Sequence, residues 1–203
     1  MTIPRSRLAL LALLAAGVGA CGATRPARFY TLEAVATSDG AAPATPYGVV
    51  VGPVTIPPAL DRPQLVVQVA PNRVDIDEFN RWAAPLPEAI AATVAANLAA
   101  LLGTPDVVAG ASASFVVTHT VTLAVQRFAS LPGKESAVDI VWTVRPAGGG
   151  AARSGRTVAH EPAPAGGFDA LAAAHSRALA KVSADVAEAI HASAARVKRP
   201  AKR

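Results

Sequence analysis

The residues that could catalyse a reaction or bind a metal ion are scattered along the sequence. The histidines occupy positions 119, 160, 175 and 191 and form neither an HExxH motif nor a pair four residues apart. The serines after Gly110 do not form the GxSxG turn of hydrolases, and Gly133-Lys134-Glu135 lacks the other residues of a phosphate-binding loop. The acidic run Asp75-Ile76-Asp77-Glu78 lacks the glycine and distal glutamate of a calcium loop and is interpreted as a solvated turn. We therefore predict no enzyme and no metal site.

The single cysteine, Cys21, follows a segment that is typical of export signals. Residues 1–20 contain a basic start, an apolar run from Leu8 to Val18 and a small-residue exit at Gly19-Ala20. The apolar run is shorter than the roughly 20 residues that a membrane-spanning helix needs. One cysteine also excludes an intramolecular disulfide. Residues 1–20 are therefore predicted to be a signal peptide.

The stretch Val18-Gly19-Ala20-Cys21-Gly22 resembles the lipobox of bacterial lipoproteins. The resemblance implies cleavage between Ala20 and Cys21, a diacylglycerol on the Cys21 thiol and an acyl group on its amino group, with no other cofactor. The next residue bears on which membrane holds the anchor. By resemblance to a retention rule of enterobacteria, Asp at this position would keep a lipoprotein in the inner membrane, so Gly22 favours the periplasmic face of the outer membrane. An ordinary signal peptide with a cysteine beside its cleavage site remains the alternative.

Charge adds little to the functional prediction. The formal net charge of +5 falls to +3 without residues 1–20, since 17 basic and 14 acidic residues remain. The basic tail, residues 196–203, has no interleaved aromatic residues, so nucleic acid is not an expected partner. A flexible tail close to anionic lipid headgroups, or one without a role, is the simpler interpretation.

Hydrophobic periodicity predicts one domain over residues 28–195, joined to Cys21 by a short tether, residues 21–27. Two amphipathic helices are expected, one opening at Pro85 and stopping at Gly103 and one from Asp169 to about Ala195. The predicted strands cover residues 28–33, 47–54, 64–69, 73–76, 112–128, 137–144 and 156–160. The fold class is α+β: a single two-layer domain whose mixed, mostly antiparallel sheet has both helices packed on one face.

Several motifs, in their order along the chain, resemble the ABC-type transport auxiliary lipoprotein component family, also called the PqiC or YmbA-like family. After the lipobox they are Arg28-Phe29-Tyr30-Thr31-Leu32, Val51-Gly52-Pro53-Val54-Thr55-Ile56-Pro57, Leu60-Asp61-Arg62-Pro63-Gln64-Leu65-Val66 and Arg81-Trp82-Ala83-Ala84-Pro85-Leu86. The resemblance implies a non-catalytic outer-membrane lipoprotein of an intermembrane lipid transport system. Its partner would be a periplasmic MCE-domain protein, and it could form ring-like homo-oligomers.

The candidate motif or partner-contact residues are Tyr30, Asp61, Arg62, Arg81 and Trp82. Asp61 and Arg62 could form a local ion pair that fixes the entry to the third strand. Trp82 is expected to be buried as a lid on the core, with a partner contact as the alternative, because Trp and Arg are enriched in binding hot spots. Two other functions remain open: a structural or cell-wall-synthase-regulating envelope lipoprotein and an envelope hydrolase.

Overall fold

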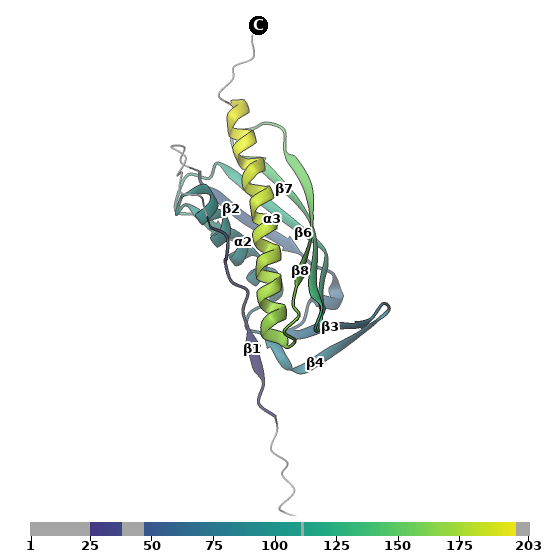
Figure 1. The fold of residues 1–203 in the computed structure, drawn as a ribbon. Helices are drawn as coiled ribbons and strands as arrows, with labels where there is room; N and C mark the ends of the chain where they lie inside the picture. The colour runs from purple at the N-terminus through teal and green to yellow at the C-terminus, as the bar shows by residue number, and fades with distance from the viewer. Residues whose placement is uncertain (1–24, 38–46, 111, 198–203) are drawn as a thin grey trace, which may run out of the picture.

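The computed structural model describes residues 25–37, 47–110 and 112–197. Its eight strands form one sheet, and α2 and α3 cover one face of it, which confirms the predicted α+β class (Figure 1). The strands are β1 (Arg28–Tyr30), β2 (Val49–Thr55), β3 (Gln64–Ala70), β4 (Arg73–Trp82), β5 (Val107–Ala109), β6 (His119–Leu131), β7 (Glu135–Pro146) and β8 (Arg153–Pro162). The helices are η1 (Pro58–Leu60), α2 (Leu86–Leu102) and α3 (Phe168–Val197).

The long strand β6 organises the sheet. One edge of β6 pairs antiparallel with β7, which pairs antiparallel with β8. The other edge pairs in parallel with β2 along its first half and with β3 at Ser130. Beyond these, β5 lies parallel to β2, β4 forms an antiparallel hairpin with β3, and β1 lies parallel to β4. The sheet is thus mixed, and its longest pairings are antiparallel.

The core lies between the sheet and the two helices. In β6, Val121, Leu123 and Val125 are buried against them, because alternate residues of a strand point to the same face. Helix α2 begins after Pro85 and ends at Gly103, whose φ of 63° is the left-handed conformation typical of a helix C-terminus. Among the described residues, no helix is both long and apolar enough to cross a membrane.

Two local predictions are wrong, and one short strand is missing from the prediction. The strand predicted from Ser112 begins only at His119, because the residues before it wrap over Gly48. The Gly48 carbonyl accepts hydrogen bonds from the backbone N–H groups of Thr118 and His119. Residues 75–78 continue β4 instead of turning, since β3 supplies pairing partners that the local pattern does not reveal. The short strand β5 was not predicted.

The β7–β8 pair depends on a glycine beneath an indole ring. A Cβ on Gly155 would lie 2.2 Å from Cζ2 of Trp142, whose Nε1 donates to Thr157 Oγ1 at 3.0 Å. Because this hydrogen bond holds the ring in place, Gly155→Ala is expected to lower the free energy of unfolding by about 1–3 kcal/mol, the usual cost of overpacking. Urea unfolding would measure it. Gly148→Ala is the matched control, because that position has nothing within 4 Å; equal midpoints for the two variants would contradict the prediction.

Candidate functional site

The sequence-predicted site residues gather at one end of the molecule. This end, which we call the tether end, consists of residues 25–30, the β3–β4 hairpin and the start of α3 (Figure 1). The rings of Tyr30 and Phe168 lie 5.9 Å apart and join β1 to α3. Helix α3 has 30 residues, so at about 1.5 Å per residue it runs roughly 45 Å away from the tether end. Ala20 and Cys21 lie outside the described residues, four to five positions before Arg25.

Tyr30 is a core residue and not an exposed contact. Its side chain is buried, and its hydroxyl donates to Asn80 Oδ1 at 2.8 Å. Asn80 is buried as well, because β1 pairs with the last residues of β4 and turns Tyr30 and Trp82 to the same side. The motif residue therefore fixes the first strand to the sheet.

Removing the Tyr30 hydroxyl should weaken this attachment. Tyr30→Phe leaves the Asn80 carbonyl without its donor, so we expect the free energy of unfolding to fall by about 1–2 kcal/mol. Thermal or urea unfolding measures the change, and Tyr30→Phe combined with Asn80→Leu should recover part of it. An unchanged midpoint for Tyr30→Phe would contradict a structural role for this hydrogen bond.

Trp82 also lies in the core, as expected, and is not an exposed partner contact. It is 6% exposed, and its ring makes edge contacts with Phe128 and His175 at centroid distances of 6.2 Å. The His175 imidazole stacks on Phe128 at 3.8 Å and an interplanar angle of 7°. These three aromatic side chains connect β4, β6 and α3 beneath the sheet.

His175 forms a buried pair that the sequence analysis missed. Its Nε2 lies 2.8 Å from Ser130 Oγ, and its Nδ1 has no hydrogen-bond partner among the described residues. Burial lowers the pKa of His175 to about 3. His175 lies four residues from both Leu171 and Leu179 on the apolar side of α3, and this spacing was the available signal. The Ser–His pair is enclosed in the core, so it connects the helix to the sheet.

A second histidine makes a similar connection near the other end of α3. His119 Nε2 lies 2.7 Å from Ser193 Oγ, and both side chains are buried. Burial lowers the pKa of His119. Two histidine–serine contacts thus join β6 to α3, and the described residues contain no group of three potential metal ligands.

The expected ion pair between Asp61 and Arg62 does not form, although the structure describes both residues. Asp61 ends η1 with its backbone N–H donating to the Pro58 carbonyl, and its side chain is exposed. Arg62 has a buried Nε without a hydrogen-bond partner among the described residues. Instead, backbone hydrogen bonds shape this turn, including one from Trp82 N to the Pro63 carbonyl at 2.7 Å.

Arg81 also reaches the surface, and it lies beside an irregular part of β4. Its Nε donates to the Glu78 carbonyl at 2.9 Å, and its guanidinium is 3.9 Å from the Glu78 carboxylate. The β3 partners jump from Arg81 to Asp77, so residues 78–80 bulge out of the ladder. Burial by itself would raise the pKa of Asp77, but the backbone N–H groups of Phe79 and Asn80 and the charge of Arg25 hold it below its ordinary value.

An open groove of about 490 Å³ runs along the same end, between β1 with its following segment and α3. Phe29, Val35 and Ala173 supply apolar walls, and Glu33 and Arg177 supply charges of opposite sign. The tether end therefore combines a groove, an exposed arginine and exposed aromatic rings. Such a surface is suited to contact with another molecule.

Comparisons with known proteins agree with the fold. A family model described as the ABC-type transport auxiliary lipoprotein component matches residues 30–187. One similar crystal structure, of a protein described as uncharacterized, has a TM-score of 0.66 at 20% identity and covers 82% of this chain and 99% of its own. Another crystal structure, of protein XCC0632 from Xanthomonas campestris in the family DUF330, has a TM-score of 0.63 at 18% identity. The match covers 79% of this chain and 93% of that protein's chain. No curated protein matches the chain. Since the family model spans most of the domain, the chain belongs to the ABC-type transport auxiliary lipoprotein component family.

Proposed function

We propose that this protein is a non-catalytic accessory subunit of an MCE-type, paraquat-inducible-like intermembrane lipid transport system. It is anchored by lipids on Cys21 to the periplasmic face of the outer membrane, and it docks on a periplasmic MCE-domain protein. The observation that carries the proposal is the family match, which begins at Tyr30, nine residues after the lipobox cysteine. The ATPase and the permease of the system are separate proteins.

The shape of the domain supports an orientation for this role. The tether end carries β1, which begins seven residues after Cys21, while α3 ends at the opposite end of the molecule (Figure 1). This opposite end, which we call the distal end, also contains the β7–β8 connection and the start of β6. Lipids on Cys21 hold the tether end near the bilayer and leave the distal end directed into the periplasm.

The orientation changes the interpretation of the basic tail. Its helical root, Val197, lies at the distal end, about 45 Å from the start of α3 at 1.5 Å per residue. Residues 198–203 lie outside the described part of the chain. A tail that starts there favours contact with a periplasmic partner over contact with the headgroups beside the anchor.

Crosslinking from the distal end tests the proposal. Val116 is 84% exposed and precedes β6 at that end, so a photoreactive residue at position 116 should capture an MCE-domain protein in cells. Affinity capture of the lipidated protein should retrieve the same partner, and deletion of the gene should weaken the envelope barrier. Reproducible capture without any MCE-domain protein would overturn the proposal, and retention on the isolated sacculus would favour the structural or cell-wall alternative.

Membrane choice has a separate test at Gly22. We expect Gly22→Asp to move the lipidated protein toward the inner membrane, because the change creates the retention residue that the wild-type position lacks. Sucrose-gradient fractionation of the two membranes measures the shift, with Ala23→Ser as the matched control. A wild-type protein that already sediments with the inner membrane would contradict outer-membrane localisation.

A further inference from the structure

We propose that one face of the tether end rests on the bilayer as a second membrane contact beside the lipid on Cys21. This face, which we call the hairpin face, consists of apolar side chains on β1 and β4 that the described chain leaves uncovered. They are Phe29, Val74, Ile76 and Phe79, which are 64%, 54%, 42% and 36% exposed. The inference rests on the proposed anchor and adds a residue-level contact to it.

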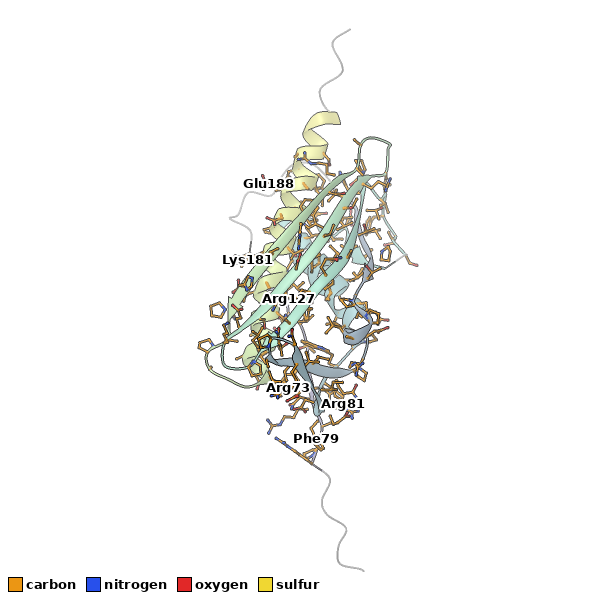
Figure 2. The ribbon with its side chains drawn as sticks, turned by 90° about the vertical axis from the view of Figure 1, so that its right-hand side faces the viewer. Arg73, Phe79, Arg81, Arg127, Lys181 and Glu188 are labelled. Carbon is orange, nitrogen blue, oxygen red and sulfur yellow. The ribbon has the colours of Figure 1, made fainter. Side chains whose placement is uncertain are left out.

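Strand pairing puts three of these side chains, those of Phe29, Val74 and Ile76, on one side of the sheet. Ile76 pairs with Val66, and Val74 pairs with Gln68, so the side chains of these two pairs share one face of the β3–β4 hairpin. Arg81 pairs with both Gln64 and Phe29, so Phe29 shares this face. Phe79 lies in the bulge of residues 78–80, where its ring meets the guanidinium of Arg25. Figure 2 shows Phe79 and Arg81 at this end of the molecule.

The opposite side of the same strands is already used by the core. Leu65, Val67, Tyr30 and Trp82 are buried there, so the hairpin face is not required to close the hydrophobic core. Exposed apolar residues that are scattered singly need no explanation, but a row of them on one face, bordered by polar residues, marks an interaction site. The row therefore requires an occupant outside this chain.

Chain length identifies a bilayer as that occupant. Cys21 and Arg25 are separated by four Cα–Cα steps, which span at most about 15 Å. Arg25 is itself in contact with the row, since its guanidinium carbon lies 5.7 Å from the centroid of the Phe79 ring. Acyl chains on Cys21 thus enter the membrane close to the hairpin face. A partner protein bound over this face would have to fit between it and the bilayer.

The charges around the row fit anionic headgroups. Arg25 lies over Phe79, Arg81 pairs with Phe29, and Arg127 Nη2 donates to Gln68 Oε1 at 3.2 Å. Two carboxylates lie next to the row. Glu78 accepts from Gln64 Nε2 at 3.1 Å and lies 3.9 Å from Arg81, and Asp77 accepts from the backbone N–H of Phe79 at 2.9 Å and interacts with the charge of Arg25. Asp75 pairs with Val67 and so belongs to the other side of the hairpin. Three guanidinium groups against the two carboxylates next to the row leave a net charge of +1, which favours a phosphatidylglycerol-type surface by about 1 kcal/mol.

A depth measurement on the lipidated full-length protein tests this contact. After lipidation the Cys21 sulfur is a thioether, so a thiol introduced by Ile76→Cys can be labelled alone with the fluorophore NBD. The protein is reconstituted into vesicles of phosphatidylethanolamine and phosphatidylglycerol at a 3:1 ratio that contain a shallow doxyl-labelled lipid. We expect the doxyl lipid to quench NBD at position 76 at least three times as strongly as NBD at Val116→Cys, the exposed control at the distal end.

One further variant and one change of lipid separate the possible occupants. Phe29→Ser with Phe79→Ser should reduce quenching at position 76 at least twofold, while phosphatidylcholine vesicles should reduce it because they lack the anionic headgroup. Equal quenching at positions 76 and 116 would overturn the inference. The inference would also be overturned if a photoreactive residue at position 76 formed an adduct with a protein in cells while the doxyl lipid did not quench NBD at that position in vesicles.

The inference and the proposed function can fail separately. A purified chain whose mass shows no lipid on Cys21 contradicts the anchor and, with it, both proposals. A lipidated chain that shows no difference between positions 76 and 116 contradicts only the bilayer contact. Crosslinking to an MCE-domain protein from position 116 is independent of either result.

Discussion

Replacing Cys21 with alanine is expected to move the protein from the membrane fraction to the soluble fraction. Two or three acyl chains contribute about 0.8 kcal/mol for each buried methylene, so their loss removes nearly all of the membrane affinity. The hairpin face cannot replace them, since a few exposed side chains and arginines supply only weak, reversible binding. Fractionation with immunoblotting measures the distribution, and the mass of the purified chain reports the lipid.

The same variant should keep its fold. The buried apolar residues of the described chain lie between Tyr30 and Ile190, so the substitution at Cys21 touches none of them. We expect circular dichroism and the unfolding midpoint to match those of a signal-free, unlipidated chain. Ala23→Ser is the control for fractionation, because it alters the tether without removing the thiol. A Cys21→Ala protein that still fractionates with the outer membrane would contradict the anchor.

Acid is expected to destabilise the domain through His175. The unfolded chain takes up a proton on this histidine below about pH 6.5, whereas the folded state resists protonation until about pH 3 because the ring is fully buried. Below pH 6.5 the unfolded state therefore binds more protons, and the free energy of unfolding falls as the pH falls. The histidine contributes a loss of about 2 kcal/mol between pH 7.5 and pH 5, since each unit of pKa difference corresponds to about 1.4 kcal/mol.

A difference measurement isolates this contribution. His175→Phe keeps a flat ring on Phe128 but cannot be protonated, so its stability should fall less between pH 7.5 and pH 5. The variant loses stability at every pH because Ser130 Oγ loses its partner, but a uniform loss leaves the slope unchanged. His119, Asp77 and other shifted groups are present in both proteins, and their contributions cancel.

Urea unfolding at several pH values provides the comparison. His160→Gln is the control, because this histidine lies on the open face of the sheet and its removal leaves the core intact. We expect His160→Gln to retain the contribution of about 2 kcal/mol that His175 makes to the loss of stability between pH 7.5 and pH 5. Parallel pH profiles for wild type and His175→Phe would show that His175 is protonated without cost in the folded state.

The motif residues show what a linear pattern can and cannot reveal. The sequence correctly predicted burial for Trp82, because a large aromatic residue before an amphipathic helix has an apolar core to enter. It did not predict that Tyr30 binds Asn80, which is 50 positions away, or that Asp61 and Arg62 remain unpaired. These outcomes depend on which strands become neighbours, and side-chain periodicity carries no information about strand order.

The sequence by itself determined the class of the fold, its two helices and its family. Hydrophobic periodicity and the proline and glycine at the ends of α2 are local signals, and they suffice for helix positions because helical hydrogen bonds join residues close in the chain. Only the tertiary structure decided that Ser130 meets His175, that Phe29 of β1 pairs with Arg81 of β4, and that Ile76 pairs with Val66. Those contacts arise from strand pairing and helix packing between distant segments. For this reason the anchor residue could be predicted from its neighbours, whereas the surface beside it could not.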